Sequence, residues 1–208
     1  TMFIIAGAGS LSLLIAFASS RERIPPARTN GRIRDDVRLL VRTPAWIAVA
    51  VAAMLTPVAL ASRASSALFW FRYVAGDDGT PIFLFLDRIG LFYTAFAVGQ
   101  LAGVVFAASM ARRFDKAHLL IFAGSVEVAA IAIFHLMPLD AIWPQTIAQV
   151  FVGVGLGMMM MLAYSMFTDI AEYLDWSTGR QMTGLAVSGA VFAIKTGVAV
   201  GAALPGML

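Results

Sequence analysis

Three charged side chains lie inside long apolar stretches of the sequence: Arg63, Glu127 and Lys195. A charge near the centre of a membrane helix costs about 3 kcal/mol or more unless the side chain faces a polar interior. Such a residue either pairs with a charge or a carbonyl group to fix helix packing, or it lines a pathway for a polar solute. Lys195 lies too deep in its stretch to reach an interface by snorkelling, so we expect it to face a bundle interior, and to be exposed if part of that bundle is missing.

A second group of charges follows the fifth apolar stretch. Asp169, Glu172 and Asp175 are spaced by threes, and Arg180 comes shortly after them. We interpret 169–180 as a polar turn, and on a helix end the three carboxylates would spread over about a third of the circumference. Charges at a membrane boundary cost little, so this location favours salt bridges over a catalytic carboxylate pair.

Several other kinds of site are not expected. The sequence has no cysteine, which excludes disulfides, thiolate metal sites and cysteine catalysis. His118 and His135 are expected at opposite membrane faces and so would not share a metal ion. There is no phosphate-binding loop, and the net charge of +3 comes from basic residues in short loops. We therefore expect no enzyme, no metal or cofactor site and no nucleic-acid partner.

The composition is that of a membrane protein. Hydrophobic residues make up 60 % of the 208 residues and charged residues 13 %, and the mean hydropathy is +0.85, whereas a soluble domain carries about 25 % charged residues. No alternating strand pattern occurs, so the prediction is an all-α, polytopic transmembrane helix bundle of about six spans. The expected spans are 2–18, 44–73, 89–111, 118–137, 145–168 and 182–208.

Local signals refine two of these spans. Pro44 suits a helix start, and Pro57 is expected to kink the same helix. Gly99 and Gly103 would permit close helix packing in the next span. The span 44–73 ends in aromatic residues, which form either an interfacial belt or a sugar-stacking surface; they are Phe69, Trp70, Phe71 and Tyr73.

The loops alternate in charge. Residues 19–43 contain seven arginines and are expected on the cytoplasmic side, with a short interfacial helix over the amphipathic part 33–41. The loop 111–116 is also basic, whereas 76–81 and 138–144 carry acidic residues and are expected outside. This alternation would place both ends of the chain outside.

One constellation resembles a known family. Its residues are Asp169, Glu172, Tyr173, Asp175, Arg180 and Lys195. Their spacing resembles the glycoside–pentoside–hexuronide:cation symporter family (melibiose permease-like) of the major facilitator superfamily, in which acids at these intervals precede a basic turn and a lysine deep in the next helix. Residues 65–78 resemble the aromatic end of the family's seventh helix, and 19–25 resemble the signature after its sixth.

The resemblance implies the second half of such a transporter, offset by one helix. Residues 1–18 would be the equivalent of the sixth helix, 19–43 the basic cytoplasmic central loop, and 44–208 a C-terminal transmembrane bundle of five helices without the last one. We therefore expect a fragment of a transporter, and a native half-size protein is the alternative.

The resemblance also implies roles for residues. Lys195 would lie near the cation and sugar pathway between the two halves, and we assign Arg63, Trp70 and Tyr73 to the same pathway. A cytoplasmic gating or salt-bridge cluster is expected as well; its members are Asp169, Glu172, Asp175, Arg180, Arg112 and Arg113. A coupling Na⁺ or H⁺ is expected in the intact transporter, but the family's cation-binding carboxylates belong to first-half helices, so that site is not expected in this chain.

The expected function is cation-coupled symport of a sugar or glycoside by alternating access in the bacterial inner membrane. Its expected partners are the lipid bilayer, the solute and the N-terminal half. A non-transporting half-size scaffold or accessory subunit is the alternative. The substrate stays open, because sugar specificity depends on first-half residues and because Phe69 and Trp70 stand where the family often has paired tyrosines.

Overall fold

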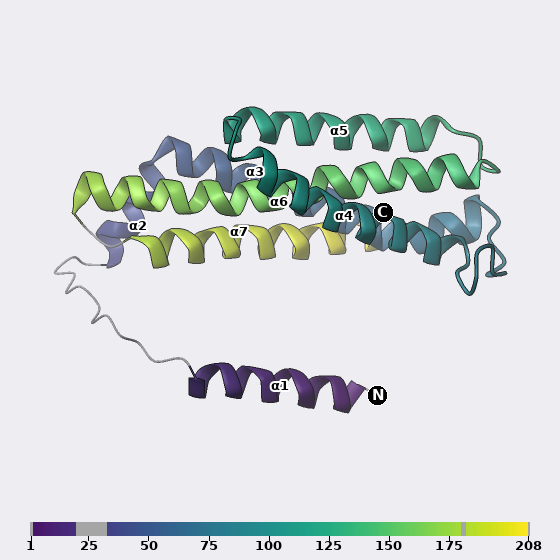
Figure 1. The fold of residues 1–208 in the computed structure, drawn as a ribbon, viewed down its shortest axis with the longest axis horizontal. Coiled ribbons are helices and arrows are strands. Elements are labelled where there is room, and N and C mark those ends of the chain that lie inside the picture. The colour runs from purple at the N-terminus through teal and green to yellow at the C-terminus, as the bar shows by residue number, and fades with distance from the viewer. Residues whose placement is uncertain (1, 20–32, 180–181, 208) are drawn as a thin grey trace. The chain divides into compact units, whose positions relative to one another are not determined.

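The computed structural model describes residues 2–19, 33–179 and 182–207. Within these ranges every regular element is a helix, apart from one isolated bridge between Phe83 and Leu86. The elements are α1 (Met2–Ser19), α2 (Ile33–Arg42), α3 (Pro44–Phe69), η1 (Trp70–Val74), α4 (Arg88–Met110), α5 (Lys116–Leu136), α6 (Ile142–Thr178), α7 (Thr183–Ala203) and η2 (Leu204–Gly206) (Figure 1). The predicted all-α fold is confirmed.

The chain divides into two units, 1–30 and 31–208. The first contains α1, an apolar helix whose described side chains are exposed. In the second unit, five helices are long and apolar enough to cross a membrane. In the first unit, Ala6–Ser19 of α1 is a shorter apolar helix. A helix satisfies its own backbone hydrogen bonds, so it can stand in lipid.

The helix α3 begins where its sequence predicts. Pro44 occupies the first turn, and Thr43 before it has an extended backbone, which suits proline because its fixed φ fits this position and its missing N–H is not needed there. Pro57 lies inside the helix. At its end α3 widens into the π-helical turn η1, and π-turns are frequent at functional sites.

Glycines let α6 pack directly against α4. The glycines that make this contact, two from each helix, are Gly99, Gly103, Gly153 and Gly157. A Cβ atom at Gly99 would overlap with the carbonyl oxygen of Val150, so no larger residue fits unless the helices separate. Close packing at Gly99 and Gly103 was predicted, and small residues of this kind are what membrane helices use to approach one another.

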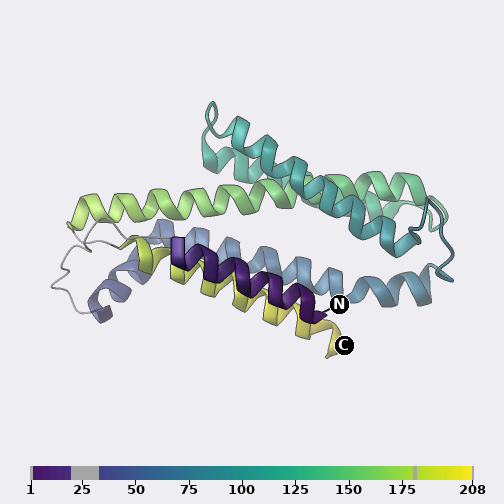
Figure 2. The same cartoon turned by 60° about the horizontal axis from the view of Figure 1, so that its bottom comes forward.

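The helices α3 and α7 form a second close pair (Figure 2). Gly197 and Gly201 of α7 face the backbone of α3 at Met54 and Val58. The Ser62 hydroxyl donates a hydrogen bond of 2.9 Å to the carbonyl oxygen of Gly201. Because α6 also packs against α3 and α7, it joins this pair to α4 and α5.

The helix α6 corrects the prediction for the fifth span. It runs for 37 residues, from Ile142 to Thr178, whereas 145–168 was expected. At 1.5 Å per residue it is about 55 Å long, against about 30 Å for a bilayer core. The acidic stretch interpreted as part of a polar turn is therefore helical. The helix ends only at Gly179, whose φ of 66° is the left-handed conformation that glycine adopts most readily.

The extended end of α6 supports α2. The buried residues of this cluster are Leu40, Ala171, Leu174, Met182 and Ala186. They join α2, the last turns of α6 and the first turn of α7. The expected interfacial helix at 33–41 thus exists as α2, with one face against the bundle.

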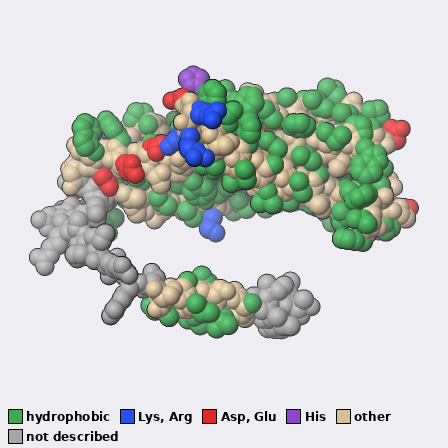
Figure 3. Space-filling model, in the orientation of Figure 1, with side chains coloured by type: hydrophobic (Ala, Val, Ile, Leu, Met, Phe, Trp, Pro, Cys, Tyr) green, Lys and Arg blue, Asp and Glu red, His purple; other side chains and the backbone are tan. Residues whose placement is uncertain are grey.

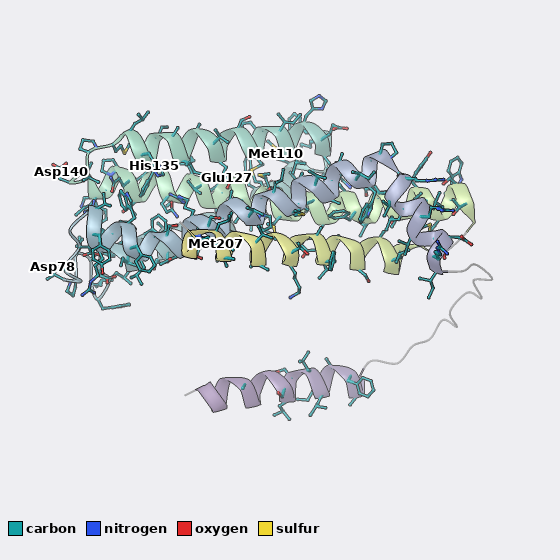
Figure 4. The ribbon with its side chains drawn as sticks, turned by 180° about the vertical axis from the view of Figure 1, so that it is seen from behind. Asp78, Met110, Glu127, His135, Asp140 and Met207 are labelled. Carbon is teal, nitrogen blue, oxygen red and sulfur yellow. The ribbon has the colours of Figure 1, made fainter. Side chains whose placement is uncertain are left out.

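Charged side chains gather away from the apolar flanks. Figure 3 shows basic and acidic side chains near the start of α5 and along the C-terminal part of α6, while hydrophobic side chains cover much of the remaining surface. Asp78 and Asp140 lie on different loops at the opposite end of the bundle (Figure 4). Two loops on one side of a membrane would have this arrangement.

Candidate functional site

Arg63 lies in the interior of the bundle beside two aromatic rings, whose centroids are 5.8 Å apart. Its guanidinium carbon is 5.0 Å from the ring centre of Phe92 on α4 and 5.0 Å from that of Phe134 on α5. The negative faces of aromatic rings attract a cation, most strongly where water is excluded. These rings therefore offset part of the cost of a charge at this depth.

The guanidinium lines two cavities. The larger one, which we call the Arg63 cavity, has a volume of about 200 Å³. Its lining residues are Arg63, Ser66, Ala67, Trp70, Phe71, Phe92, Phe134 and His135. The second cavity, of about 130 Å³, is lined by Leu60, Arg63, Ala64, Phe92, Tyr93, Phe96 and Gln149. Arg63 thus faces open space on the inside of the bundle.

Part of the hydrogen-bonding capacity at Arg63 is unused. Among the residues that the structure describes, its buried Nη2 atom has no hydrogen-bond partner, and neither has the buried Oε1 atom of Gln149. Glu127 on α5 attracts Arg63 electrostatically, but the two side chains form no ion pair within the described ranges. Glu127 lies midway along the bundle (Figure 4). A buried donor without an acceptor costs about 1–3 kcal/mol, so Arg63 lies in this place at a cost to stability.

The predicted pathway residues are only partly brought together. Trp70 lines the Arg63 cavity and contacts Phe71 and Phe134 with its ring, at centroid distances of 4.9 Å and 5.7 Å. Tyr73, one turn further along, is 79 % exposed and is absent from the cavity wall. Of the two predicted aromatic pathway residues, Trp70 and Tyr73, only Trp70 remains a candidate for solute contact at this cavity.

Lys195 lies away from the Arg63 cavity. Its side chain is exposed on α7, and it has no ion-pair partner in the part of the chain that the structure describes. Gly197 on the same helix faces α3, and two residues correspond to about 200° of rotation. Lys195 therefore points away from the α3–α7 contact.

The predicted cytoplasmic cluster contains one ion pair. Lys116 Nζ at the start of α5 lies 2.5 Å from Asp169 Oδ2 on α6. Lys116 was not among the predicted members, although its basic loop was noted. The pair lies in a groove of about 580 Å³ that also includes residues of α3. Beside it, Asp115 caps α5, and backbone N–H groups of Ala117 and His118 hold the pKa of its carboxyl group below the usual value.

Asp175 has a different role from the one predicted. One carboxylate oxygen accepts a hydrogen bond of 2.5 Å from the backbone N–H of Met182, and the other accepts one of 3.0 Å from the Thr183 hydroxyl. The side chain therefore caps α7 across the turn. Glu172, three residues earlier, is exposed.

Two further predicted cluster members, Arg112 and Arg113, do not join Asp169 or Asp175. Arg112 and Arg113 are exposed and form no ion pair with the described residues. Arg180 lies outside the residues that the structure describes. Among the cluster members that the structure describes, the geometry thus shows one interhelical ion pair, to Asp169, and one helix cap, by Asp175.

Arg88 was missed by the sequence analysis. It is buried at the start of α4 and donates hydrogen bonds to Gln145 Oε1 at 3.1 Å, to the carbonyl oxygen of Leu139 and, at 3.4 Å, to that of Ala75. Gln145 in turn donates to the carbonyl oxygen of Pro138. These bonds tie the loop before α4 and the loop between α5 and α6 to the ends of their helices. One signal in the sequence could have identified Arg88. It is an arginine close to the acidic loop 76–81, which was expected outside, and the positive-inside rule does not expect an arginine there.

Comparison with known proteins identifies the family. The family model described as "MFS/sugar transport protein" matches residues 1–208. The chain is 23 % identical over 199 residues to the inner membrane symporter YicJ of Escherichia coli (strain K12), covering 95 % of this chain and 41 % of that protein. It is 22 % identical over 205 residues to the glucuronide carrier protein homolog of the same organism, covering 99 % and 43 %.

A third relative comes from another bacterium. The isoprimeverose transporter of Lactiplantibacillus pentosus is 22 % identical over 208 residues, which cover 99 % of this chain and 42 % of that protein. The chain thus spans about two fifths of the length of the curated relatives it matches. No solved structure gives a significant match. Since the family match covers the whole chain, the chain belongs to the MFS/sugar transport protein family, whose members are membrane transporters rather than enzymes.

Proposed function

We propose that this chain forms one half of a cation-coupled transporter of a sugar or glycoside in the bacterial inner membrane. The observation that carries the proposal is a cavity inside an apolar bundle whose wall includes a tryptophan, Trp70, and an arginine, Arg63. The names of the relatives, an inner membrane symporter, a glucuronide carrier protein homolog and an isoprimeverose transporter, support the same class of solute.

The proposed mechanism is alternating access between this bundle and the N-terminal half. The backbone contacts at Gly99 and Gly197 join α4 to α6 and α3 to α7, which suits a bundle that moves as one body. The groove around Lys116 and Asp169 would open and close at the cytoplasmic side, with the ion pair between them as one of its contacts.

Lys195 is proposed as a coupling residue. It is exposed within an apolar span, and an uncompensated charge there is costly in lipid. An acidic residue of the N-terminal half, close to a bound Na⁺ or H⁺, would hold its charge. The cation itself is expected to bind carboxylates of that other half.

The test uses the protein expressed from its complete reading frame. Lys195→Val is expected to abolish gradient-driven accumulation of labelled sugar in membrane vesicles while expression stays near that of the unaltered protein. Lys195→Arg is the matched control that keeps the charge, and it should retain part of the accumulation. An unchanged accumulation ratio in Lys195→Val would rule out a coupling role.

A further inference from the structure

The short helix α2 lies where a spanning helix begins. Only Thr43 separates α2 from α3, which is long and apolar enough to cross a membrane. Thr43 has an extended backbone, so the chain bends there, and α2 runs at an angle to the long helices (Figure 2). Leu40 is buried against the last turns of α6 and the first turn of α7. The helix α2 is therefore held in one orientation, at the level where α3 enters the membrane.

An apolar stripe on α2 is uncovered in the part of the chain that the structure describes. Ile33, Val37 and Val41 are spaced by four residues, so they lie along one side of the helix. Their exposed fractions are 77 %, 40 % and 54 %. Leu40, which lies next to this stripe, is only 3 % exposed. The apolar stripe thus starts at the contact with the bundle and continues onto the free surface of α2.

A basic stripe runs beside the apolar one. Arg34, Arg38 and Arg42 each follow a member of the apolar stripe by one residue, which places them about 100° further around the helix. All three are exposed, and none forms an ion pair with a residue that the structure describes. The free surface of α2 therefore carries a row of cations next to a row of apolar side chains.

Two acids on α2 oppose this positive charge. Asp36 is half-buried and precedes Leu40 by four residues, so it lies on the side that faces the bundle. Asp35 is exposed and borders the basic stripe on its other side. Three exposed arginines against one exposed acid leave the free surface of α2 positive, and Asp35 weakens the attraction of an anion to it.

This combination fits a membrane surface that carries negative charge. A helix in the membrane interface places its apolar side among acyl chains and its basic side among headgroups. Arginine forms two-point, charge-assisted hydrogen bonds with phosphate. A zwitterionic headgroup offsets its phosphate with an ammonium group, whereas an anionic phospholipid keeps a net negative charge that attracts basic segments at the membrane surface. The place of α2 beside the start of a spanning helix favours a lipid over an acidic protein segment.

We infer that α2 binds anionic phospholipid headgroups through Arg34, Arg38 and Arg42, while the apolar stripe lies among the acyl chains next to the headgroups. Because α2 packs against the ends of α6 and α7, the bound lipid would hold this end of the bundle at the membrane surface. The inference goes beyond the transport function and is independent of the solute.

The first experiment compares two lipids that differ in headgroup charge. The protein, expressed from its complete reading frame, is purified in an uncharged detergent and titrated with brominated phosphatidylglycerol or with brominated phosphatidylcholine of the same chain length. Bromine quenches nearby tryptophan fluorescence, and Trp46 packs against the same cluster as Leu40. The quenching that is lost in Trp46→Phe therefore reports lipid close to α2. We expect tighter binding of phosphatidylglycerol, with a difference that shrinks as salt screens the charges. Equal affinity for the two lipids would overturn the inference.

The second experiment assigns the preference to the basic stripe. Arg38→Gln/Arg42→Gln should weaken the affinity for phosphatidylglycerol roughly tenfold to thirtyfold and leave that for phosphatidylcholine nearly unchanged. Arg112→Gln/Arg113→Gln is the matched control, because it removes the same charge from exposed arginines outside α2, and it should keep the preference. An equal loss in both variants would attribute the preference to net charge alone and overturn the inference.

A variant with stronger binding separates lipid binding from folding. Asp35→Asn removes the exposed acid beside the basic stripe and should tighten the affinity for phosphatidylglycerol severalfold, which a damaged fold would not do. The competing outcome is that Arg38→Gln/Arg42→Gln lowers the Tm in lipid-free detergent while neither variant changes the affinity for phosphatidylglycerol. In that case the arginines pair with acids elsewhere in the complete protein, and α2 is not a lipid site.

Discussion

Asp175 provides a sharp test of the structure because the sequence and the geometry assign it different roles. The carboxylate bonds to the backbone N–H of Met182 at 2.5 Å and to the Thr183 hydroxyl at 3.0 Å. These bonds satisfy groups at the start of α7 that have no partner within that helix. Asp175→Ala would remove both of them and leave the gating of the transporter untouched.

The size of the effect follows from the two bonds. Loss of a capping side chain costs about 0.5–2 kcal/mol, and a hydrogen bond to a charged group contributes roughly 1.5–3 kcal/mol. Since Asp175 is only half-buried, we expect a total of about 1–3 kcal/mol. For a chain of this length that corresponds to a fall in Tm of roughly 2–10 °C.

The assay is thermal unfolding in detergent, followed by tryptophan fluorescence. Glu172→Ala is the matched control, because Glu172 is an exposed acid on the same helix and surface changes of this kind stay within about 0.5 kcal/mol. An equal fall in Tm for both variants would refute the capping role. An unchanged Tm in Asp175→Ala together with lost transport would restore the predicted gating role.

Three further predictions concern packing, the ion pair and pH. Gly157→Leu should force α4 and α6 apart, because even a Cβ atom there overlaps with the carbonyl oxygen of Gln100. The yield of folded protein on size-exclusion chromatography should therefore fall sharply. Gly184→Leu is the control and should leave this yield unchanged, because a side chain at Gly184 meets open space. A double-mutant cycle on Lys116 and Asp169, both partly exposed, should give a coupling energy of only about 0.2–1 kcal/mol, and a larger value would mean that the pair is shielded from water. The Asp115 carboxylate should stabilise α5 fully at pH values above its unfolded pKa of 3.8, and this stabilisation should be lost as the pH falls through its lower folded pKa. The Tm difference between the unaltered protein and Asp115→Ala should therefore be constant at neutral pH and shrink in acid. A Tm difference that does not depend on pH would contradict this.

Much of the fold could be predicted because lipid restricts the choice. Apolar stretches of about 20 residues have few alternatives to spanning helices, and the spacing of Gly99 and Gly103 predicted the close contact that the structure shows. The prediction that the fifth span ends at residue 168 was wrong for a specific reason. Asp169, Glu172 and Asp175 were interpreted as a turn from their charge, although no glycine or proline occurs between Gly157 and Gly179.

The candidate site could be predicted only in part. The depth of Arg63 in an apolar stretch indicated that it needs a special environment, but the rings that cover it come from α4 and α5, and no sequence spacing links Phe92 to Phe134. The hydrogen bonds of Arg88 depend on two loops meeting in space. Such contacts arise from tertiary packing, which a local pattern does not encode.

The most direct test of the central claim is uphill accumulation of a labelled sugar or glycoside. Vesicles that contain the protein expressed from its complete reading frame receive an imposed Na⁺ or H⁺ gradient, and the internal and external solute concentrations are measured at steady state. The account predicts a ratio well above one that rises with the gradient and returns to one when an ionophore removes it. A ratio that stays at one for every sugar and either cation would contradict cation-coupled transport and favour a non-transporting scaffold.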